Sequence, residues 1–264
     1  MTEIKGTCNP AFETVLEAFN RNFENGDLGA SCAIAVDGEM VVDIWGGIAD
    51  HNSGKLWEKD TIVNVWSTTK TMTALCILVL IDRGEIEIDS PVSKYWKGFS
   101  KNGKENVLVK HLLSHSAGLP GFDDPISEDQ LFDWDYVCER LASQSPWWEP
   151  GSVSGYHPIT HGWLLGELLR RVDGRTLGKF FAEEIANPMR SDFHIGLNEK
   201  HYDRVAVLDT SLVKNLETSE IEEETSIIRR LRAHGHMGAE IANTDRWRKA
   251  EFPAANGHGN ARSV

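Results

Sequence analysis

The sequence contains no long hydrophobic run. Its longest nearly apolar stretch, residues 72–81, is far too short to cross a bilayer, and residues 1–10 include no apolar segment of the kind found in signal peptides. We therefore predict neither a membrane-spanning segment nor a membrane partner.

Cysteine is scarce and scattered. Cys8, Cys32, Cys76 and Cys138 show no CxxC spacing, which argues against a disulfide framework or a zinc site. Cys76 lies on the apolar face of a predicted helix, where it is expected to be a small core residue. This cysteine usage favours a reducing, cytoplasmic location.

Basic residues are outnumbered by acidic ones. Lys and Arg total 27 against 40 Asp and Glu, which gives a net charge of −13. Such a surface repels phosphate backbones, so nucleic acid is not an expected partner. A small-molecule substrate is the partner we predict, and the oligomeric state is left open.

Several motifs of metal and cofactor enzymes are missing. The chain has no HExxH, no GxSxG elbow and no glycine-rich phosphate loop. Two histidine pairs, His157 with His161 and His234 with His236, are not accompanied by an HExxH motif or a set of carboxylates. We predict that the protein uses no metal and no cofactor.

The first quarter of the chain predicts a helix followed by a hairpin. Asn9 and Pro10 suit a helix start, and Gly26 lies just past its expected end. Two β-rich runs, residues 31–36 and 40–45, flank Asp37-Gly38, a strong turn signal. Residues 61–66 are expected to add an extended piece, so residues 1–65 form one portion of an α/β region.

Helices and loops dominate after that point. Periodicity and capping signals predict helices near residues 67–82, 109–113, 127–141, 159–172 and 176–185, within a mainly helical region over residues 66–264. The acidic run at residues 217–224 is interpreted as a solvated helix end or loop. We find no internal repeat.

Strands are hard to find beyond residue 66. A lone hairpin is marginal in water, yet only residues 204–208 offer a weak further strand. The glycines around His258 are interpreted as the opening of a helix-like segment. We therefore expect the C-terminal strands of the fold to be missing and the natural protein to continue past Val264.

The first candidate catalytic residues are Ser67 and Lys70. They lie three residues apart at the start of a predicted apolar helix, which places a hydroxyl and an amine on one face. This spacing alone is weak, because Ser211 and Lys214 repeat it. The alternative interpretation is that Ser67 caps the helix and Lys70 reaches solvent.

Two further motifs follow in order: the stretch HLLSHSAGL at residues 111–119, and Trp-Glu-Pro-Gly at residues 148–151 followed by Tyr156. With them, the chain over roughly residues 10–200 resembles the serine β-lactamase superfamily, in its class C, penicillin-binding and family VIII esterase branch. The resemblance implies an α/β, β-lactamase-like fold: an antiparallel sheet flanked by helices, plus a mainly helical region.

The resemblance also implies roles. Ser67 corresponds to the nucleophile, Lys70 to its partner and Tyr156 to the general base and acid. The backbone N–H of Ser67 is expected to supply half of an oxyanion hole. Trp148 and His157 are candidate substrate-binding residues, although Trp148 is equally interpreted as a loop anchor.

The chain departs from the family pattern in two places. Tyr156-His157-Pro158 lacks the asparagine that often stands two residues after the tyrosine and binds an amide, and no Lys-Thr-Gly motif is found. We therefore predict a serine hydrolase that cleaves carboxylic esters through an acyl-serine intermediate. The alternatives are β-lactamase or D-alanyl-D-alanine peptidase activity, or a non-catalytic binding or scaffold protein with this fold.

Overall fold

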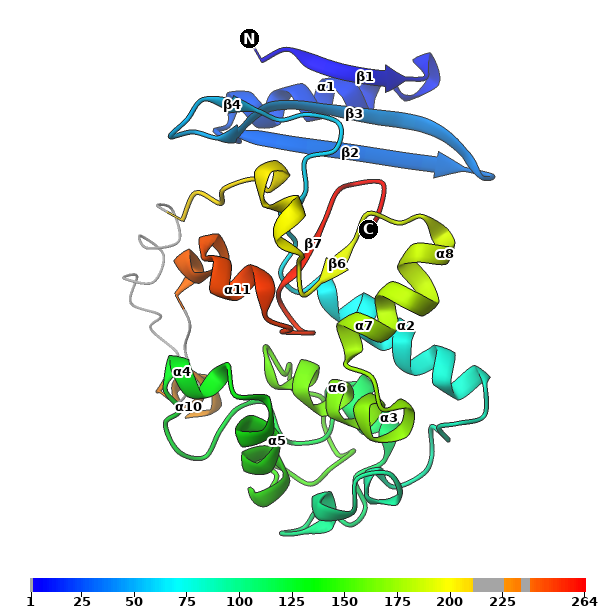
Figure 1. Ribbon diagram of the computed structural model, residues 1–264, viewed down its shortest axis with the longest axis vertical. Coiled ribbons are helices and arrows are strands. Elements are labelled where there is room, and N and C mark those ends of the chain that lie inside the picture. The colour runs from blue at the N-terminus through cyan, green and yellow to red at the C-terminus, as the bar shows by residue number, and fades with distance from the viewer. Residues whose placement is uncertain (1, 211–225, 234–237) are drawn as a thin grey trace.

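An antiparallel sheet with one helix packed on it forms one end of the molecule (Figure 1). The computed structural model describes residues 2–210, 226–233 and 238–264. The sheet has the order β1-β3-β2, with β4 paired to β3. Its elements are β1 (Ile4–Cys8), α1 (Glu13–Glu24), β2 (Gly29–Val36), β3 (Glu39–Asp50) and β4 (Lys55–Leu56).

The predicted hairpin is confirmed. Asp37 and Gly38 have φ of 51° and 82°, and Val36 pairs with Glu39 across them. Two consecutive residues of positive φ give a turn whose twist matches that of the strands. Strand β1 was not predicted, because a glycine at its centre, Gly6, weakens the strand pattern.

The N-terminal helix is also confirmed, in two pieces. Asn9 Oδ1 accepts a hydrogen bond from Ala11 N at 2.9 Å, and this caps a short 3-10 helix, Pro10–Phe12, that leads into α1. Phe19 of α1 packs against Val42 and Ile44 of β3, which makes a small core under the sheet.

A second, smaller sheet lies inside the helical body. Its antiparallel order is β5-β7-β6, with β5 (Val63–Asn64), β6 (His194–Ile195) and β7 (Gly257–Gly259). The prediction that the glycines around His258 open a helix is wrong. They form the central strand β7, whose backbone groups are paired with β5 on one side and β6 on the other. No local sequence pattern reveals these distant partners.

Helices surround this small sheet, and most were predicted within a few residues. The strand predicted at residues 204–208 is limited to one bridge, between Ile62 and Val205. The α-helices are α2 (Thr69–Asp82), α3 (Val109–Leu113), α4 (Glu128–Leu131), α5 (Trp134–Ser143), α6 (Thr160–Asp173), α7 (Leu177–Phe181), α8 (Asn187–Met189), α10 (Ser226–Ala233) and α11 (Asp245–Lys249). A π-helical segment, Ala182–Ala186, joins α7 to α8, and 3-10 turns occur at Val92–Lys94, Lys97–Ser100, Glu199–Arg204 and Ala239–Asn243.

The helix predicted over residues 127–141 is two helices. Ser127 and Gln130 form the predicted capping box, but Asp133 then caps a new start by accepting from Tyr136 N at 3.0 Å. The acidic run at 217–224, the second Ser-Lys pair at 211 and 214, and the histidines at 234 and 236 lie outside the described residues. Among the described residues, no helix is long and apolar enough to span a membrane.

The main core lies in the helical body, where α2 and α6 are the central helices. Cys76 has no exposed surface and belongs to this core, as predicted. The fold is therefore mixed α/β, with antiparallel sheets and helices, in agreement with the prediction.

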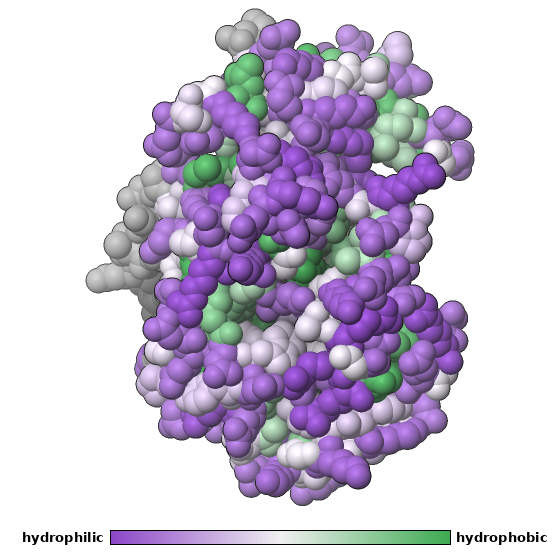
Figure 2. Space-filling model, viewed as in Figure 1, coloured by the Kyte–Doolittle hydropathy of each residue, from purple (hydrophilic) through white to green (hydrophobic). Residues whose placement is uncertain are grey.

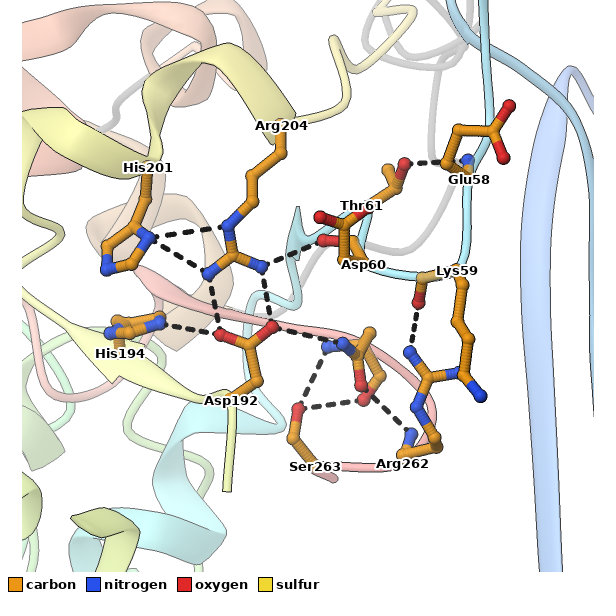
Figure 3. Close-up of polar contacts among 11 residues, drawn as sticks. Glu58, Lys59, Asp60, Thr61, Asp192, His194, His201, Arg204, Arg262 and Ser263 are labelled. Atoms are coloured by element: carbon orange, nitrogen blue, oxygen red, sulfur yellow. Dashed lines mark hydrogen bonds and ion pairs between the residues drawn. The ribbon is translucent and has the colours of Figure 1, made fainter. Parts of the chain in front are cut away.

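A polar network anchors the last residues of the chain beside the second sheet (Figure 3). Asp192 accepts two hydrogen bonds from the Arg204 guanidinium, at 2.6 and 2.7 Å, and one from Asn260 Nδ2 at 3.3 Å. Arg204 also donates to the carbonyl oxygen of Asp60 at 2.8 Å. These contacts tie the segment before β5 to the segment after β7.

Candidate active site

Ser67 lies at the junction between β5 and α2. Trp66, just before it, has a φ of 45°, an unusual value for a bulky residue. Thr69 Oγ1 donates to the Trp66 carbonyl at 2.5 Å and accepts from Gly257 N at 2.8 Å. This pair of bonds fixes the turn against β7 and leaves the Ser67 side chain exposed.

Ser67 is not the cap of α2. The residue at the N-cap position is Thr68, and no side-chain hydrogen bond caps the helix there. The Ser67 hydroxyl instead faces two side chains, those of Lys70 and Tyr156. The alternative that Ser67 merely caps the helix is therefore wrong.

Lys70 is buried, with 7% of its surface exposed. Its Nζ donates to Ser67 Oγ at 3.0 Å and to the Ala254 carbonyl at 2.8 Å. Burial lowers the pKa of the Lys70 amine, and a hydrogen bond with Tyr156 offsets part of that effect. The alternative that Lys70 reaches solvent is wrong as well.

Tyr156 closes the site from the loop before α6. Its hydroxyl donates to Ser67 Oγ at 2.6 Å, and Lys70 Nζ lies 4.9 Å from the centre of its ring. The structure thus brings together the three residues that the sequence motifs single out, although Tyr156 is 89 residues from Ser67. Half of the tyrosine surface, 51%, stays exposed.

The loop that carries Tyr156 runs along the turn after α3. Trp147 N donates to the Gly118 carbonyl at 2.7 Å, and Gly151 N donates to the Ser116 carbonyl at 2.9 Å. Ser154 Oγ adds a bond of 3.0 Å to the Ser114 carbonyl. The stretch at residues 111–119 therefore supports the tyrosine loop.

His157 points away from the site. Its side chain is 1% exposed, its Nε2 accepts from Leu119 N at 3.0 Å, and its Nδ1 donates to the Gly155 carbonyl at 2.6 Å. Burial lowers its pKa to about 4, so the ring is neutral at pH 7. With both nitrogens occupied inside the protein, His157 supports the loop and offers a substrate no free polar atom.

Trp148 packs against the same loop. Its indole lies edge-on to the His157 ring at 5.9 Å, and a Cβ placed on Gly155 would lie 2.6 Å from Trp148 Cη2. The tryptophan thus occupies the space under Gly155. This contact favours the loop-anchor interpretation of Trp148.

His161, in α6, is close enough to His115 and Lys70 for their charges to lower its pKa. It is 2% exposed, its ring stacks on that of His115 at 4.6 Å, and burial lowers its pKa to about 2. Its Nδ1 is buried without a hydrogen-bond partner. Within residues 2–210, 226–233 and 238–264, no three potential metal ligands come together.

The comparisons with known proteins agree on one family. The Beta-lactamase family profile matches residues 14–264. The esterase/beta-lactamase LipL of Mycobacterium tuberculosis is 39% identical over 193 residues, which cover 72% of this chain and 44% of that protein. The chain thus spans less than half the length of this curated relative.

Solved structures give the same result. A crystal structure of a family VIII carboxylesterase matches with a TM-score of 0.88 and 41% identity, covering 98% of this chain and 68% of that one. A penicillin-binding protein homolog from Caulobacter crescentus matches with a TM-score of 0.88 and 40% identity over the same shares. The described chain therefore has the fold of these proteins over nearly its whole length.

Proposed function

Because the chain belongs to the Beta-lactamase family, we propose that it acts as a serine hydrolase on small carboxylic esters, with Ser67 as the nucleophile. One observation carries the proposal: Ser67 Oγ lies 3.0 Å from Lys70 Nζ and 2.6 Å from the Tyr156 hydroxyl. A serine hydroxyl is a poor nucleophile until a neighbouring group takes its proton, and two such groups are in place.

The resting hydrogen bonds define what must change for attack. Ser67 Oγ accepts from both neighbours, so one of these bonds has to reverse before the hydroxyl loses its proton. Lys70 is suited to this, since burial lowers the pKa of its amine. We propose that Lys70 and Tyr156 act as a coupled pair that holds the serine proton between them.

Acylation then follows in two steps. Ser67 Oγ bonds to the ester carbonyl carbon while its proton passes to the Lys70–Tyr156 pair, and the carbonyl oxygen takes the negative charge. When the tetrahedral intermediate collapses, the bond to the alcohol oxygen breaks and the pair returns the proton to the leaving alcohol. Water attacks the acyl-serine by the same proton path, which releases the acid and restores Ser67.

The oxyanion needs donors close to Ser67. We propose the backbone N–H of Ser67 as one of them, since it lies at the positive end of the α2 dipole. The oxyanion would then form above the N-terminal turn of α2, on the exposed side of Ser67. Figure 2 shows a hollow near the middle of the face it depicts, where hydrophobic residues gather between hydrophilic lobes.

An ester explains the site better than an amide does. The position two residues after Tyr156 is Pro158, which has no side-chain donor, and His157 is buried with both ring nitrogens in use. Neither of these two positions therefore offers a polar partner to the amide of a β-lactam or D-alanyl peptide. LipL is named an esterase/beta-lactamase, so β-lactamase activity belongs in the test.

Ester turnover tests the proposal. Purified protein is expected to hydrolyse a short-chain p-nitrophenyl ester, and Ser67→Ala is expected to abolish this. Tyr156→Phe should lower kcat by about 10²- to 10⁴-fold, the usual contribution of a general acid–base group. Turnover of a chromogenic cephalosporin in preference to the ester would favour the β-lactamase alternative.

A covalent probe separates an enzyme from a scaffold. A fluorophosphonate is expected to label wild-type protein at Ser67 and to leave Ser67→Ala unlabelled. If folded wild-type protein shows neither labelling nor turnover, the non-catalytic alternative replaces the hydrolase proposal.

We propose that residues 1–65 and 66–264 are distinct portions, the second carrying Ser67, Lys70 and Tyr156; β5 and β7, one from each portion, pair in the second sheet. We also keep the cytoplasmic location predicted from the cysteines.

A further inference from the structure

His115 holds the chain on both sides of Tyr156. Its carbonyl oxygen accepts from Gly155 N at 2.9 Å, and its Nδ1 accepts from His157 N at 3.1 Å. Its ring lies 4.9 Å from the tyrosine ring. One residue therefore binds the N–H of Gly155 before the tyrosine and the N–H of His157 after it, and contacts one side of the tyrosine ring.

This arrangement depends on an unusual backbone. His115 has a φ of 58°, in the left-handed region, which few non-glycine residues adopt. Such a conformation persists only where the surroundings hold it. The two hydrogen bonds to the tyrosine loop are contacts of that kind.

The Nδ1 bond also defines the protonation state of His115. Because Nδ1 accepts from an N–H group, it carries no proton, so the neutral ring has its proton on Nε2. The groups that face the ring are Lys70 from α2, Tyr156 and His157 from the loop, and His161 from α6. None of the four is a carboxylate, and burial and then the charge of Lys70 lower the pKa of His115.

We propose that His115 is a positioning residue for ester hydrolysis: the lone pair on Nδ1 of its neutral imidazole fixes the peptide after Tyr156 and so holds the phenol on Ser67. The inference rests on the proposed function. A proton on Nδ1 would turn the acceptor into a donor, release His157 N–H and place a second cation beside Lys70. Protonation of His115 therefore breaks the hydrogen bond between His157 N and His115 Nδ1.

Two variants separate the acceptor from the backbone conformation. Both His115→Asn and His115→Gly suit a left-handed residue. Only asparagine offers an oxygen near the position of Nδ1 that can accept from His157 N–H. A difference between the two variants therefore reports the acceptor and not backbone strain.

Steady-state kinetics on a p-nitrophenyl ester give the first readout. We expect His115→Gly to lower kcat by about 10- to 100-fold, as a misplaced catalytic group does, with KM changed less than about three-fold. His115→Asn should recover at least ten-fold of the lost kcat. The rate of Ser67 labelling by a fluorophosphonate should follow the same order.

Hydrogen exchange of the His157 amide gives a second readout that needs no activity. This amide should be protected in wild type and in His115→Asn, and should exchange faster in His115→Gly. In wild type its protection factor should fall as the pH drops through the lowered pKa of His115, whereas in His115→Asn it should not. The wild-type measurement stands even where a variant fails to fold.

The outcomes are distinct for the two proposals. If wild-type protein shows neither ester turnover nor Ser67 labelling, the proposed function is overturned. Exchange of the His157 amide still tests whether His115 Nδ1 holds that amide. Equal kcat in wild type and His115→Gly overturns the positioning role. If kcat falls equally in both variants while the His157 amide stays protected in His115→Asn, the loss is due to the missing imidazole ring. That result overturns the role of Nδ1.

Discussion

Lys70 occupies a position that is unfavourable for an ordinary lysine. It is 7% exposed, and its hydrogen bonds go to the hydroxyls of Ser67 and Tyr156 and to a carbonyl oxygen, with no carboxylate among them. Burial of an amine without a counter-charge lowers its pKa, which makes it a better proton acceptor near neutral pH. A buried amine with a lowered pKa and no counter-charge is typical of a functional site.

Replacement of Lys70 by arginine tests this role. Arginine keeps the charge but does not give up its proton, so Lys70→Arg is expected to lower kcat/KM by at least about 10²-fold. In wild type, kcat/KM should rise with pH through the lowered lysine pKa, because the neutral amine is the active form. Initial rates from pH 5 to 10 measure both effects.

Lys179→Arg is the matched control, since Lys179 has 61% of its side chain exposed in α7. Its rate should stay within two-fold of wild type. A Lys70→Arg variant with normal activity would remove Lys70 from the proton path.

The sequence motifs identify Tyr156 but not the arrangement of the residues around it. The stretch at 111–119 carries a family resemblance, but it does not indicate that His115 lies beside Tyr156. The burial of His157 was equally invisible, because a histidine beside a site residue looks the same in sequence whether it faces substrate or core.

At the scale of elements, buried charged side chains bind the C-terminal end of one helix and connect neighbouring helices. Lys104 has no exposed surface, and its Nζ donates to the carbonyl oxygen of Gln144, the residue that ends α5. A cation at a helix C-terminus interacts favourably with the helix dipole and satisfies a free carbonyl. Burial nevertheless lowers the pKa of Lys104 to about 8.

This lowered pKa predicts a stability that rises with pH. Between about pH 8 and the unfolded-state value near 10.4, the unfolded chain binds the proton that the folded chain has lost. The free energy of unfolding of wild type should therefore rise by up to about 3 kcal/mol relative to Lys104→Met across that window. Urea denaturation at pH 7.5, 9 and 10 measures the difference.

Lys101→Met, at an exposed position of the same segment, is the control and should change stability by less than about 0.5 kcal/mol. A constant difference between wild type and Lys104→Met over this pH range would show that the buried amine does not change its charge there.

Glu167 joins α5 to α6 from a fully buried position. Its carboxylate accepts from Trp134 Nε1 of α5 at 2.9 Å, from Arg170 Nε at 2.7 Å and from Arg171 Nε at 2.8 Å. Burial alone would raise its pKa, but the hydrogen bonds from Arg170 and Trp134 hold it below its usual value. The ionised form is therefore the stable one in the folded protein.

Glu167→Gln should lower the free energy of unfolding at pH 7 by about 2–4 kcal/mol, because Arg171 loses its counter-charge and Arg170 keeps only its pair with Asp135. A carboxylate with a lowered pKa stabilises the fold above the unfolded value near 4.3, and this stability is lost as pH falls through the folded value. The gap between wild type and variant should thus be narrower at pH 3 than at pH 7. Chemical denaturation at both pH values checks this.

Glu183→Gln serves as its control. Glu183 is 46% exposed and pairs with Arg175 at 2.8 Å, so its loss should cost less than about 1 kcal/mol. If both variants lose the same stability, the burial of Glu167 does not account for the effect.

At the scale of the whole molecule, hydrogen bonds from residues near the C-terminal strand β7 and from residue 207 join the first sheet to the helical body. Arg262 Nη1 donates to Asp43 Oδ1 of β3 at 2.8 Å, and the same guanidinium reaches the carbonyl of Lys59. Val207 N donates to the Ala49 carbonyl of β3 at 2.8 Å. Asp43 and Arg262 are largely buried, with 13% and 23% of their side chains exposed.

Arg262→Met should therefore weaken the join between the two parts. We expect the free energy of unfolding to fall by about 1–3 kcal/mol, the range for a hydrogen bond to a charged group, and Tm to fall by several degrees. Differential scanning calorimetry measures the shift. Lys5→Met, which removes an exposed pair with Glu58 at 3.1 Å, should shift Tm by much less.

The sequence by itself determined the local parts of this protein. The Asp37-Gly38 hairpin, the cap at Asn9, and the placement of Ser67 and Lys70 one turn apart all arise from interactions over two to four residues. Short-range hydrogen bonds and side-chain periodicity decide such features, so a single chain reveals them.

Tertiary structure decided how those parts meet. Tyr156 reaches Ser67 across 89 residues, and the carbonyl that binds Lys70 comes from Ala254, 184 residues away. The glycines around His258 became a strand because β5 and β6 supplied partners on both sides. Pairing and burial of this kind depend on which distant surfaces pack together, and no local pattern encodes that choice.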